Sequence, residues 1–66
     1  SPLKYAAVYE QEFKKNKLAW EFYLKQPPSY KKLVIHYVMS AKQEKTRLSR
    51  LGKVIQASEE QRRINQ

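Results

Sequence analysis

The chain has 66 residues, enough for one small domain, and its 14 Lys and Arg residues against 6 acidic residues give a net charge of +8. It contains no Cys and a single Gly, which excludes disulfides, zinc ribbons, iron–sulfur clusters and glycine-rich phosphate loops. The longest apolar run, residues 33–39, is far shorter than the roughly 20 residues that a membrane-spanning helix needs.

The pattern along the chain predicts an all-α fold, because strand alternation is absent and helix breakers occur at only a few points. Ser1 is predicted to cap a first helix that has Pro2 at its first position. Tyr5, Tyr9 and Phe13 follow at i, i+4 and i+8, so they lie on one side of that helix. The first helix should therefore bury an aromatic stripe.

Asn16 is predicted to cap a short second helix over residues 17–26. Its apolar residues lie nearly all round, with Trp20 and Leu24 on one side and Leu18 and Phe22 on the other. A short helix of this kind needs neighbours on several sides. We expect Trp20 to be a core anchor and Phe22 to be structural.

Pro27 and Pro28 end the second helix, because the residue before a proline is pushed out of the α region. We interpret the segment as a rigid corner, in which Ser29 caps the third helix and Tyr30 packs back on the bundle. Proline-rich segments can also bind aromatic grooves when they are exposed and extended. Exposed prolines and a Ser29 without a capping bond would favour that alternative.

The third helix is apolar over more than half its circumference. We therefore expect a compact bundle of about four helices with this third helix at its centre. Its stripe consists of Tyr30, Leu33, Val34, Tyr37, Val38 and Ala41, widened by Ile35 and Met39.

A fourth helix is predicted to present Leu48, Leu51, Val54, Ile55 and Ser58 on one face. Gly52 borders that face, and the absence of a side chain there should let two helices approach closely. Residues 59–66 lose the apolar periodicity. We expect them to fray, with Ile64 folding back.

Residue types for a catalytic or metal site are scarce. Asp and Cys are absent, and His36 is the only histidine. No acid lies near His36 on the helical wheel to orient it, and Glu59 and Glu60 are adjacent in the expected tail, which is poor placement for acid–base work. We expect no catalytic residue, no metal and no cofactor, and we interpret the chain as not being an enzyme.

Lys31 and Lys32 fall in the first turn of the third helix, where positive charge opposes the helix dipole. We hypothesise that they form an outward contact surface for an anionic partner, with simple solvation as the alternative. Arg47 lies at the edge of the apolar face of the fourth helix, one turn from Glu44, and is predicted to be structural.

A basic helical nucleic-acid-binding domain is the second hypothesis, since Arg47, Arg50 and Lys53 project from the fourth helix. The link over residues 40–45 lacks the glycine that is typical of a helix-turn-helix. The basic residues are also spread over several helices, which favours nonspecific attraction over the reading of bases.

Several motifs resemble one known family. "QPPSY" at 26–30, "VMSAK" at 38–42, "TR" at 46–47 and "RRI" at 62–64 resemble the C-terminal region of the bacteriocin-protection YdeI/OmpD-associated family, over roughly residues 9–64. Two departures stand out. Lys31 and Lys32 replace the usual arginine pair, which keeps the charge but removes the bidentate hydrogen bonds that arginine can form. Residues 59–61 occupy positions where a small residue and Gly are usual.

The resemblance implies a bacterial protein linked by name to outer-membrane protein association and to protection against cationic antimicrobial peptides, and it names no enzymatic activity. Family members are often longer, so we expect residues 1–66 to be a single helical domain, the C-terminal module of a longer protein. Its start at Ser1-Pro2 without an initiator Met agrees with processing, and the lack of a signal-peptide pattern favours the cytoplasm. The leading hypothesis is a non-catalytic binding or scaffolding module with an anionic or protein partner.

Overall fold

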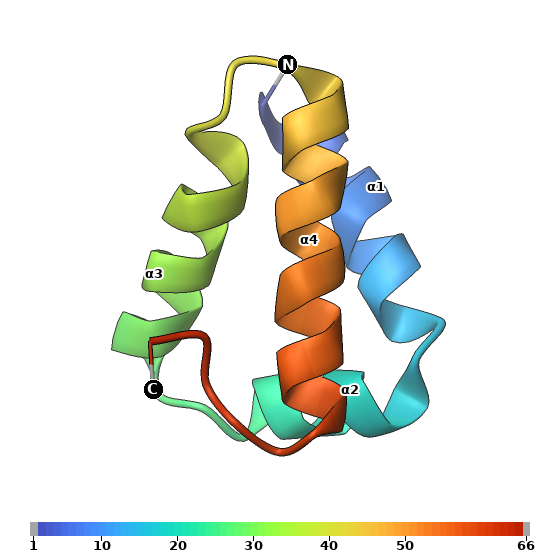
Figure 1. Cartoon of the computed structure of the whole chain (residues 1–66), viewed down its shortest axis with the longest axis vertical. Coiled ribbons are helices and arrows are strands. Elements are labelled where there is room, and N and C mark those ends of the chain that lie inside the picture. The colour runs from blue at the N-terminus through green and yellow to red at the C-terminus, as the bar shows by residue number, and fades with distance from the viewer. Residues whose placement is uncertain (1, 66) are drawn as a thin grey trace.

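The computed structural model describes residues 2–65, with side chains from residue 7 onward, and the described residues form four α-helices and no strand (Figure 1). The predicted small all-α bundle is therefore confirmed. The predicted cap at Ser1 and the side chain of Tyr5 lie outside what is described. The helices are α1 (Pro2–Lys14), α2 (Lys17–Leu24), α3 (Pro28–Met39) and α4 (Glu44–Glu59).

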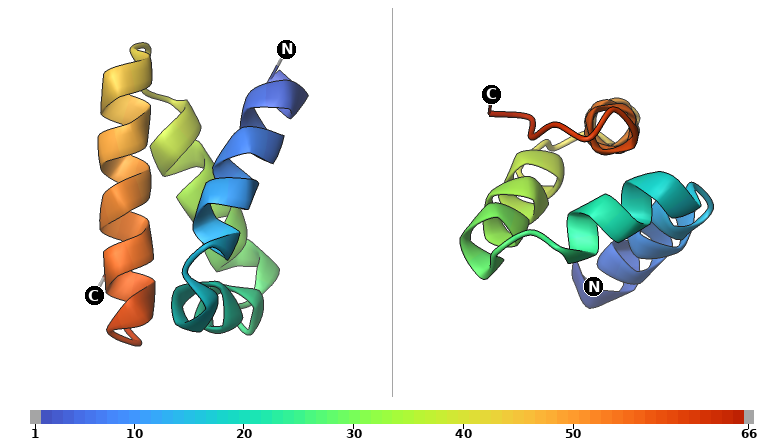
Figure 2. Two further views of the ribbon diagram at one scale, coloured as in Figure 1. Left: turned by 90° about the vertical axis from the view of Figure 1, so that its right-hand side faces the viewer. Right: turned by 90° about the horizontal axis from the view of Figure 1, so that it is seen from below.

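Helix α4 is the centre of the bundle, and the prediction that the third helix is central is wrong. Helix α4 packs against each of the other three helices, most extensively against α2, which crosses near its C-terminal end (Figures 1 and 2). Its buried face consists of Leu51, Val54, Ala57 and Ser58, and the one buried residue of α2 is Ala19. Small buried residues on both helices permit this close packing.

Helix α3 has the wide apolar surface that the sequence predicts, but the other helices cover only part of it. Tyr30, Val34 and Val38 are buried. Leu33 and Ile35 keep 40% and 53% of their surface exposed. The helix therefore packs as one wall of the bundle, with an uncovered apolar flank.

Gly52 does not mark a close approach of two helices, contrary to the prediction. A Cβ atom added there would meet no other atom within 4 Å, and the residue is exposed. The close contact of α4 lies further along the helix, at Ala57 and Ser58. The Ser58 hydroxyl donates to the Val54 carbonyl at 2.8 Å, which satisfies the buried polar group.

The junctions between helices are held by local chemistry. Asn16 caps α2 as predicted, because its Oδ1 accepts a hydrogen bond from the Ala19 amide at 3.1 Å. Its Nδ2 donates to Glu59 at 3.1 Å, which ties this junction to the end of α4. The next junction differs from the prediction, since Pro27 is the N-cap of α3 and makes no side-chain capping bond.

Ser29 is consequently not the cap of α3, and that prediction is wrong. Pro28 occupies the first helical position, which suits its fixed φ and its missing amide hydrogen. Ser29 is therefore the second helical residue, one position too late to cap. Pro27 is extended, with φ −69° and ψ 159°, and both prolines are exposed, so the corner is uncapped and the alternative of an exposed, extended ligand segment gains over the capped corner.

The chain does not fray where α4 ends. Gln61 adopts the left-handed conformation with φ 62°. Its amide donates to the Ser58 carbonyl and the Arg62 amide donates to the Ala57 carbonyl, both at 3.0 Å. This pair of bonds is a Schellman motif, and it reverses the chain. The expectation of a frayed tail is wrong through residue 65, while the predicted return of Ile64 onto the bundle is confirmed.

Candidate functional site

An apolar groove lies between α1 and α3, which stand apart on the side of the bundle away from α4 (Figure 2). Its volume is about 380 Å³, and its lining comes from all four helices. The helical period explains the walls. Tyr9 and Phe13 are one turn apart on α1, and the pairs 34–35 and 38–39 are one turn apart on α3, so each set lies on one face of its helix. Among the described lining residues, Glu10 is the charged one.

Aromatic rings form one end of the groove. Phe13 is 3% exposed and lies edge-on to Trp20, with ring centroids 5.4 Å apart. Tyr23 packs against both, at 4.9 Å from Phe13 and 5.5 Å from Trp20. Burial raises the pKa of the Tyr23 hydroxyl, with smaller contributions from Glu10 and Tyr30. The end of the groove is therefore a rigid apolar surface with a neutral hydroxyl at its edge.

Trp20, the predicted core anchor, lies at the boundary between the core and the groove. Its ring is partly buried and packs against the core cluster. The Lys14 ammonium lies over the ring, 5.4 Å from its centroid. A cation over an exposed indole contributes about 0.5–1 kcal/mol. Trp20 is thus both a packing residue and a groove-lining residue.

The two walls of the groove carry different charge. On α1, Lys14 pairs with Glu10 at 3.9 Å, and both side chains are about half exposed. On α3, a shallow hollow formed by Lys32, His36 and Ser40 shares Ile35 and Met39 with the groove. The wall on α1 is therefore nearly neutral, and the wall on α3 is basic.

Of Lys31 and Lys32, the predicted anionic contact, Lys32 forms part of this shallow hollow, and neither lysine lines the groove itself. Lys31 lies one turn before Val34 and Ile35 and is half-buried, and Lys32 is exposed. Neither lysine forms an ion pair or a hydrogen bond with another residue in the part of the chain that is described. Their charges are therefore available to a partner.

The predicted structural residues fall into two groups of contacts. Tyr30 is buried, and its hydroxyl accepts a hydrogen bond from the Ile64 amide at 3.0 Å. Arg63 lies over the Tyr30 ring at 5.4 Å and donates to Gln26 at 2.7 Å. This first group joins the start of α3 to the C-terminal tail.

The second group holds the link between α3 and α4. Arg47 donates from Nε to the Ala41 carbonyl at 2.7 Å. Arg50 donates to the Tyr37 carbonyl at 2.8 Å and lies 5.2 Å from the centroid of the half-buried Tyr37 ring. Of the remaining structural predictions, Leu51 is buried and Phe22 is partly buried.

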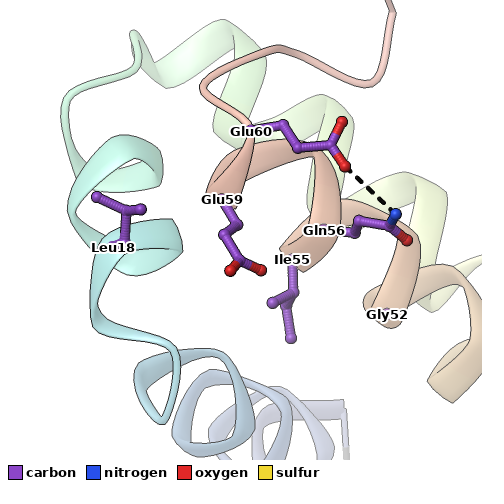
Figure 3. A pocket seen from close by; sticks show the side chains of 6 residues that line it. All are labelled: Leu18, Gly52, Ile55, Gln56, Glu59 and Glu60. Atoms are coloured by element: carbon purple, nitrogen blue, oxygen red, sulfur yellow. Dashed lines mark hydrogen bonds between the residues drawn. The ribbon is translucent and has the colours of Figure 1, made fainter.

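A second hollow lies at the C-terminal end of α4 and includes Gly52 (Figure 3). Its carboxylates already have partners, since Glu59 accepts from Asn16 and Glu60 accepts from Gln56 at 3.3 Å. The bond from Arg62 to Glu60, together with that from Gln56, lowers the pKa of the Glu60 carboxyl. The hollow is wide open, and both acids are engaged by side chains of the domain itself.

No group of three or more His, Cys, Asp or Glu side chains is close enough to hold a metal ion among the residues described. None of the described helices has both the length and the apolar character needed to cross a membrane.

Sequence reasoning did not predict the groove, although two of its signals are visible in the chain. The stripe of Tyr9 and Phe13 and the apolar width of α3 both indicate buried surfaces. The sequence does not show that α1 and α3 leave Ile35 uncovered, because that depends on how α4 spaces them. Glu10, which lines the groove, has no distinguishing sequence signal.

Comparison with known proteins gives one family. The model of the bacteriocin-protection, YdeI or OmpD-associated family matches residues 3–65, nearly the whole chain. No curated protein and no solved structure matches the chain. The family match agrees with the motifs at 26–30 and 62–64, and it gives no support to the nucleic-acid alternative. The chain belongs to the bacteriocin-protection, YdeI or OmpD-associated family.

Proposed function

We propose that the chain is a non-catalytic binding module of a protein that takes part in protection against bacteriocins, and that the groove between α1 and α3 is its recognition site. The observation that carries this proposal is the groove itself, a concave apolar surface of about 380 Å³ with aromatic residues at one end. Concave, mostly apolar surfaces with a few polar groups are the usual form of binding sites. The family description supplies the biological setting.

Action by association is supported by the state of the titratable groups. Glu59 and Glu60 are engaged by side chains of the domain itself. The His36 side chain is exposed and has no hydrogen-bond partner among the described residues, so nothing in the described part of the chain orients it. Groups arranged in this way are suited to a surface and not to proton transfer.

Two exposed aliphatic residues of α3 provide the test. Ile35 lines the groove, and Leu33 lies on the same helix but not among the lining residues. In bacteria that need this protein to survive exposure to a bacteriocin, Ile35→Glu should abolish protection, and the matched control Leu33→Glu should retain it. Equal protection by both variants, with equal melting temperatures, would exclude the groove as the recognition site.

A second measurement tests whether the protein acts without turnover. The purified protein is incubated with the bacteriocin, and the mass of the peptide is followed over time. An unchanged mass is expected for a binding module. Cleaved or modified peptide would overturn the non-catalytic part of the proposal, whatever the result for Ile35.

A further inference from the structure

We propose that the occupant of the groove is an acidic amphipathic helix of a partner protein. The inference rests on the proposed function, since it names the chemistry of what the same groove binds. It starts from the shape of the site. Two helices, α1 and α3, form its walls and Leu51 of α4 contributes to its floor, an arrangement that accepts the apolar face of a third helix.

The apolar contacts available to such a helix are specific. Ile35 is 53% exposed, and Trp20, Tyr23 and Met39 are partly buried and pack on the core behind them. These side chains are already positioned by the fold, so a ligand pays little to order them. Apolar residues on one face of a partner helix would remove Ile35 and Trp20 from water.

Charge determines which helix fits. Lys32 and His36 form part of the shallow hollow beside the groove, Lys31 precedes Lys32 in the chain, and neither lysine has an ion partner among the described residues. On the opposite wall, Glu10 is offset by Lys14 at 3.9 Å. The surroundings of the groove are therefore net positive, within a chain of net charge +8. A helix with acidic residues beside its apolar face is attracted, and a basic one is repelled.

Charge also argues against two other occupants. A second copy of the chain would bring another +8 to the contact, which opposes association. A cationic bacteriocin would meet the same repulsion, so the partner helix is better sought in an acidic protein than in the peptide itself. The positive charge would also attract an anionic membrane surface. Binding to lipid vesicles distinguishes a membrane from a partner helix.

The only Trp in the chain, Trp20, lines the groove and reports its occupancy directly. The probe is a Trp-free amphipathic peptide of about four helical turns, with Leu on one face and Glu on its flanks. Its twin carries Lys in place of every Glu. At low salt the acidic peptide should shift Trp20 emission saturably, and the basic twin should bind at least about tenfold more weakly.

Charge-matched variants locate the contact. Lys31→Glu with Lys32→Glu should weaken binding of the acidic peptide by about three- to thirtyfold. Each exposed ion pair contributes little binding energy, but the substituted carboxylates also repel the peptide. Lys45→Glu with Lys53→Glu changes the net charge equally on exposed positions of α4 that do not line the groove, and it should change binding by less than about twofold. Ile35→Glu should abolish the emission shift.

Equal binding of the two peptides, or no binding of the acidic one, would overturn the inference. Vesicles of anionic phosphatidylglycerol and of neutral phosphatidylcholine form the last arm. A shift of Trp20 emission with anionic vesicles but not with the acidic peptide would assign the groove to a membrane instead. The proposed function is judged separately, because loss of protection in Ile35→Glu would stand even if the acidic peptide fails to bind.

Discussion

Arg63 donates a hydrogen bond from Nε to Oε1 of Gln26 over 2.7 Å and thereby joins two segments that are 37 residues apart in the chain. The adjacent residue, Ile64, donates its amide hydrogen to the hydroxyl of Tyr30 at 3.0 Å. The motifs "QPPSY" and "RRI", which carry much of the family resemblance, therefore meet in space. Their contact holds the C-terminal tail on the start of α3 and gives these residues a structural role.

The first prediction concerns the hydroxyl of Tyr30. Tyr30→Phe keeps the buried ring but removes the acceptor of the Ile64 amide, so the free energy of unfolding should fall by about 1 kcal/mol. Urea denaturation measures the loss, and faster hydrogen exchange at Ile64 locates it. Tyr37→Phe is the control on the same helix, because the Tyr37 hydroxyl makes no hydrogen bond with any described residue. Equal destabilisation by the two variants would contradict the assigned role.

The second prediction concerns the turn at Gln61, whose φ of 62° is costly for a residue with a side chain. The free energy of unfolding of Gln61→Gly should exceed that of Gln61→Ala by about 1 kcal/mol, because both variants lose the bond from Gln61 Nε2 to the Ser58 carbonyl at 3.1 Å and only Gly adopts this conformation without strain. Gln11→Gly, at an exposed position inside α1, should lower the free energy of unfolding by about 1 kcal/mol. Thermal and urea melts compare the variants. Equal stability of Gln61→Gly and Gln61→Ala would show that the turn is not strained.

The local features of the fold could be predicted from single residues. Asn16 caps α2 because its side chain reaches an amide three residues away, and this depends only on nearby atoms. Pro27 and Pro28 break the chain for the same kind of local reason. Ser29 was misassigned because two adjacent prolines offer two possible starting points, and Pro28 suits the first helical position better than Ser29 suits the cap.

The features that depend on distant parts of the chain could not be predicted. The width of the apolar surface on α3 suggested a central helix, but centrality is decided by which helices can approach most closely. The small residues Ala19, Ala57 and Ser58 place α2 against α4 instead. The groove beside Ile35 results from that choice. Helix α3 begins at Pro28, so Lys31 ends its first turn and Lys32, predicted to lie in that turn, is one residue beyond it. The sequence did not indicate a groove nearby.

The third prediction compares two aromatic residues of unequal burial. Phe13 is 3% exposed, whereas Trp20 is only partly buried at the edge of the groove. Phe13→Ala should therefore destabilise the domain by about 3–5 kcal/mol, comparable to the total stability of a domain of this size. Trp20→Ala should cost less, although Trp is the larger residue, because part of its surface is already in water. Circular dichroism with urea titration measures both variants, and a larger loss for Trp20→Ala would place it inside the core.

The fourth prediction follows from Tyr9, which is 5% exposed and donates to Glu44 at 2.6 Å. Burial, aided by the bond to Glu44 and partly opposed by Arg47, raises the pKa of its hydroxyl in the folded state. In the unfolded chain the pKa is near 10. The resulting stability is fully present below about pH 10 and is lost as pH rises through the folded pKa.

Tyr9→Phe removes this titration, so its free energy of unfolding should fall less steeply than that of the unaltered protein between about pH 9 and 11. Tyr23, whose pKa is also raised, contributes a decline of the same sign to both proteins. At neutral pH the variant should already be less stable by about 1 kcal/mol, because Glu44 loses a donor. Parallel pH profiles for the two proteins would rule out a contribution from Tyr9.

The last prediction separates the basic residues by role. Arg47 donates to the Ala41 carbonyl at 2.7 Å. It also lowers the pKa of the Tyr9 hydroxyl, which bonds to Glu44. Arg47→Glu removes a charge-assisted hydrogen bond and adds a second carboxylate beside Glu44, so it should lower the free energy of unfolding by about 2 kcal/mol. Lys31→Glu with Lys32→Glu puts acids at the fourth and fifth residues of α3, near the N-terminal end where the helix dipole favours negative charge. This double variant should be unchanged or more stable by a few tenths of a kcal/mol. Melting curves at low salt decide the matter, and a double lysine variant that melts earlier than Arg47→Glu would show that these lysines support the fold and are not free for a partner.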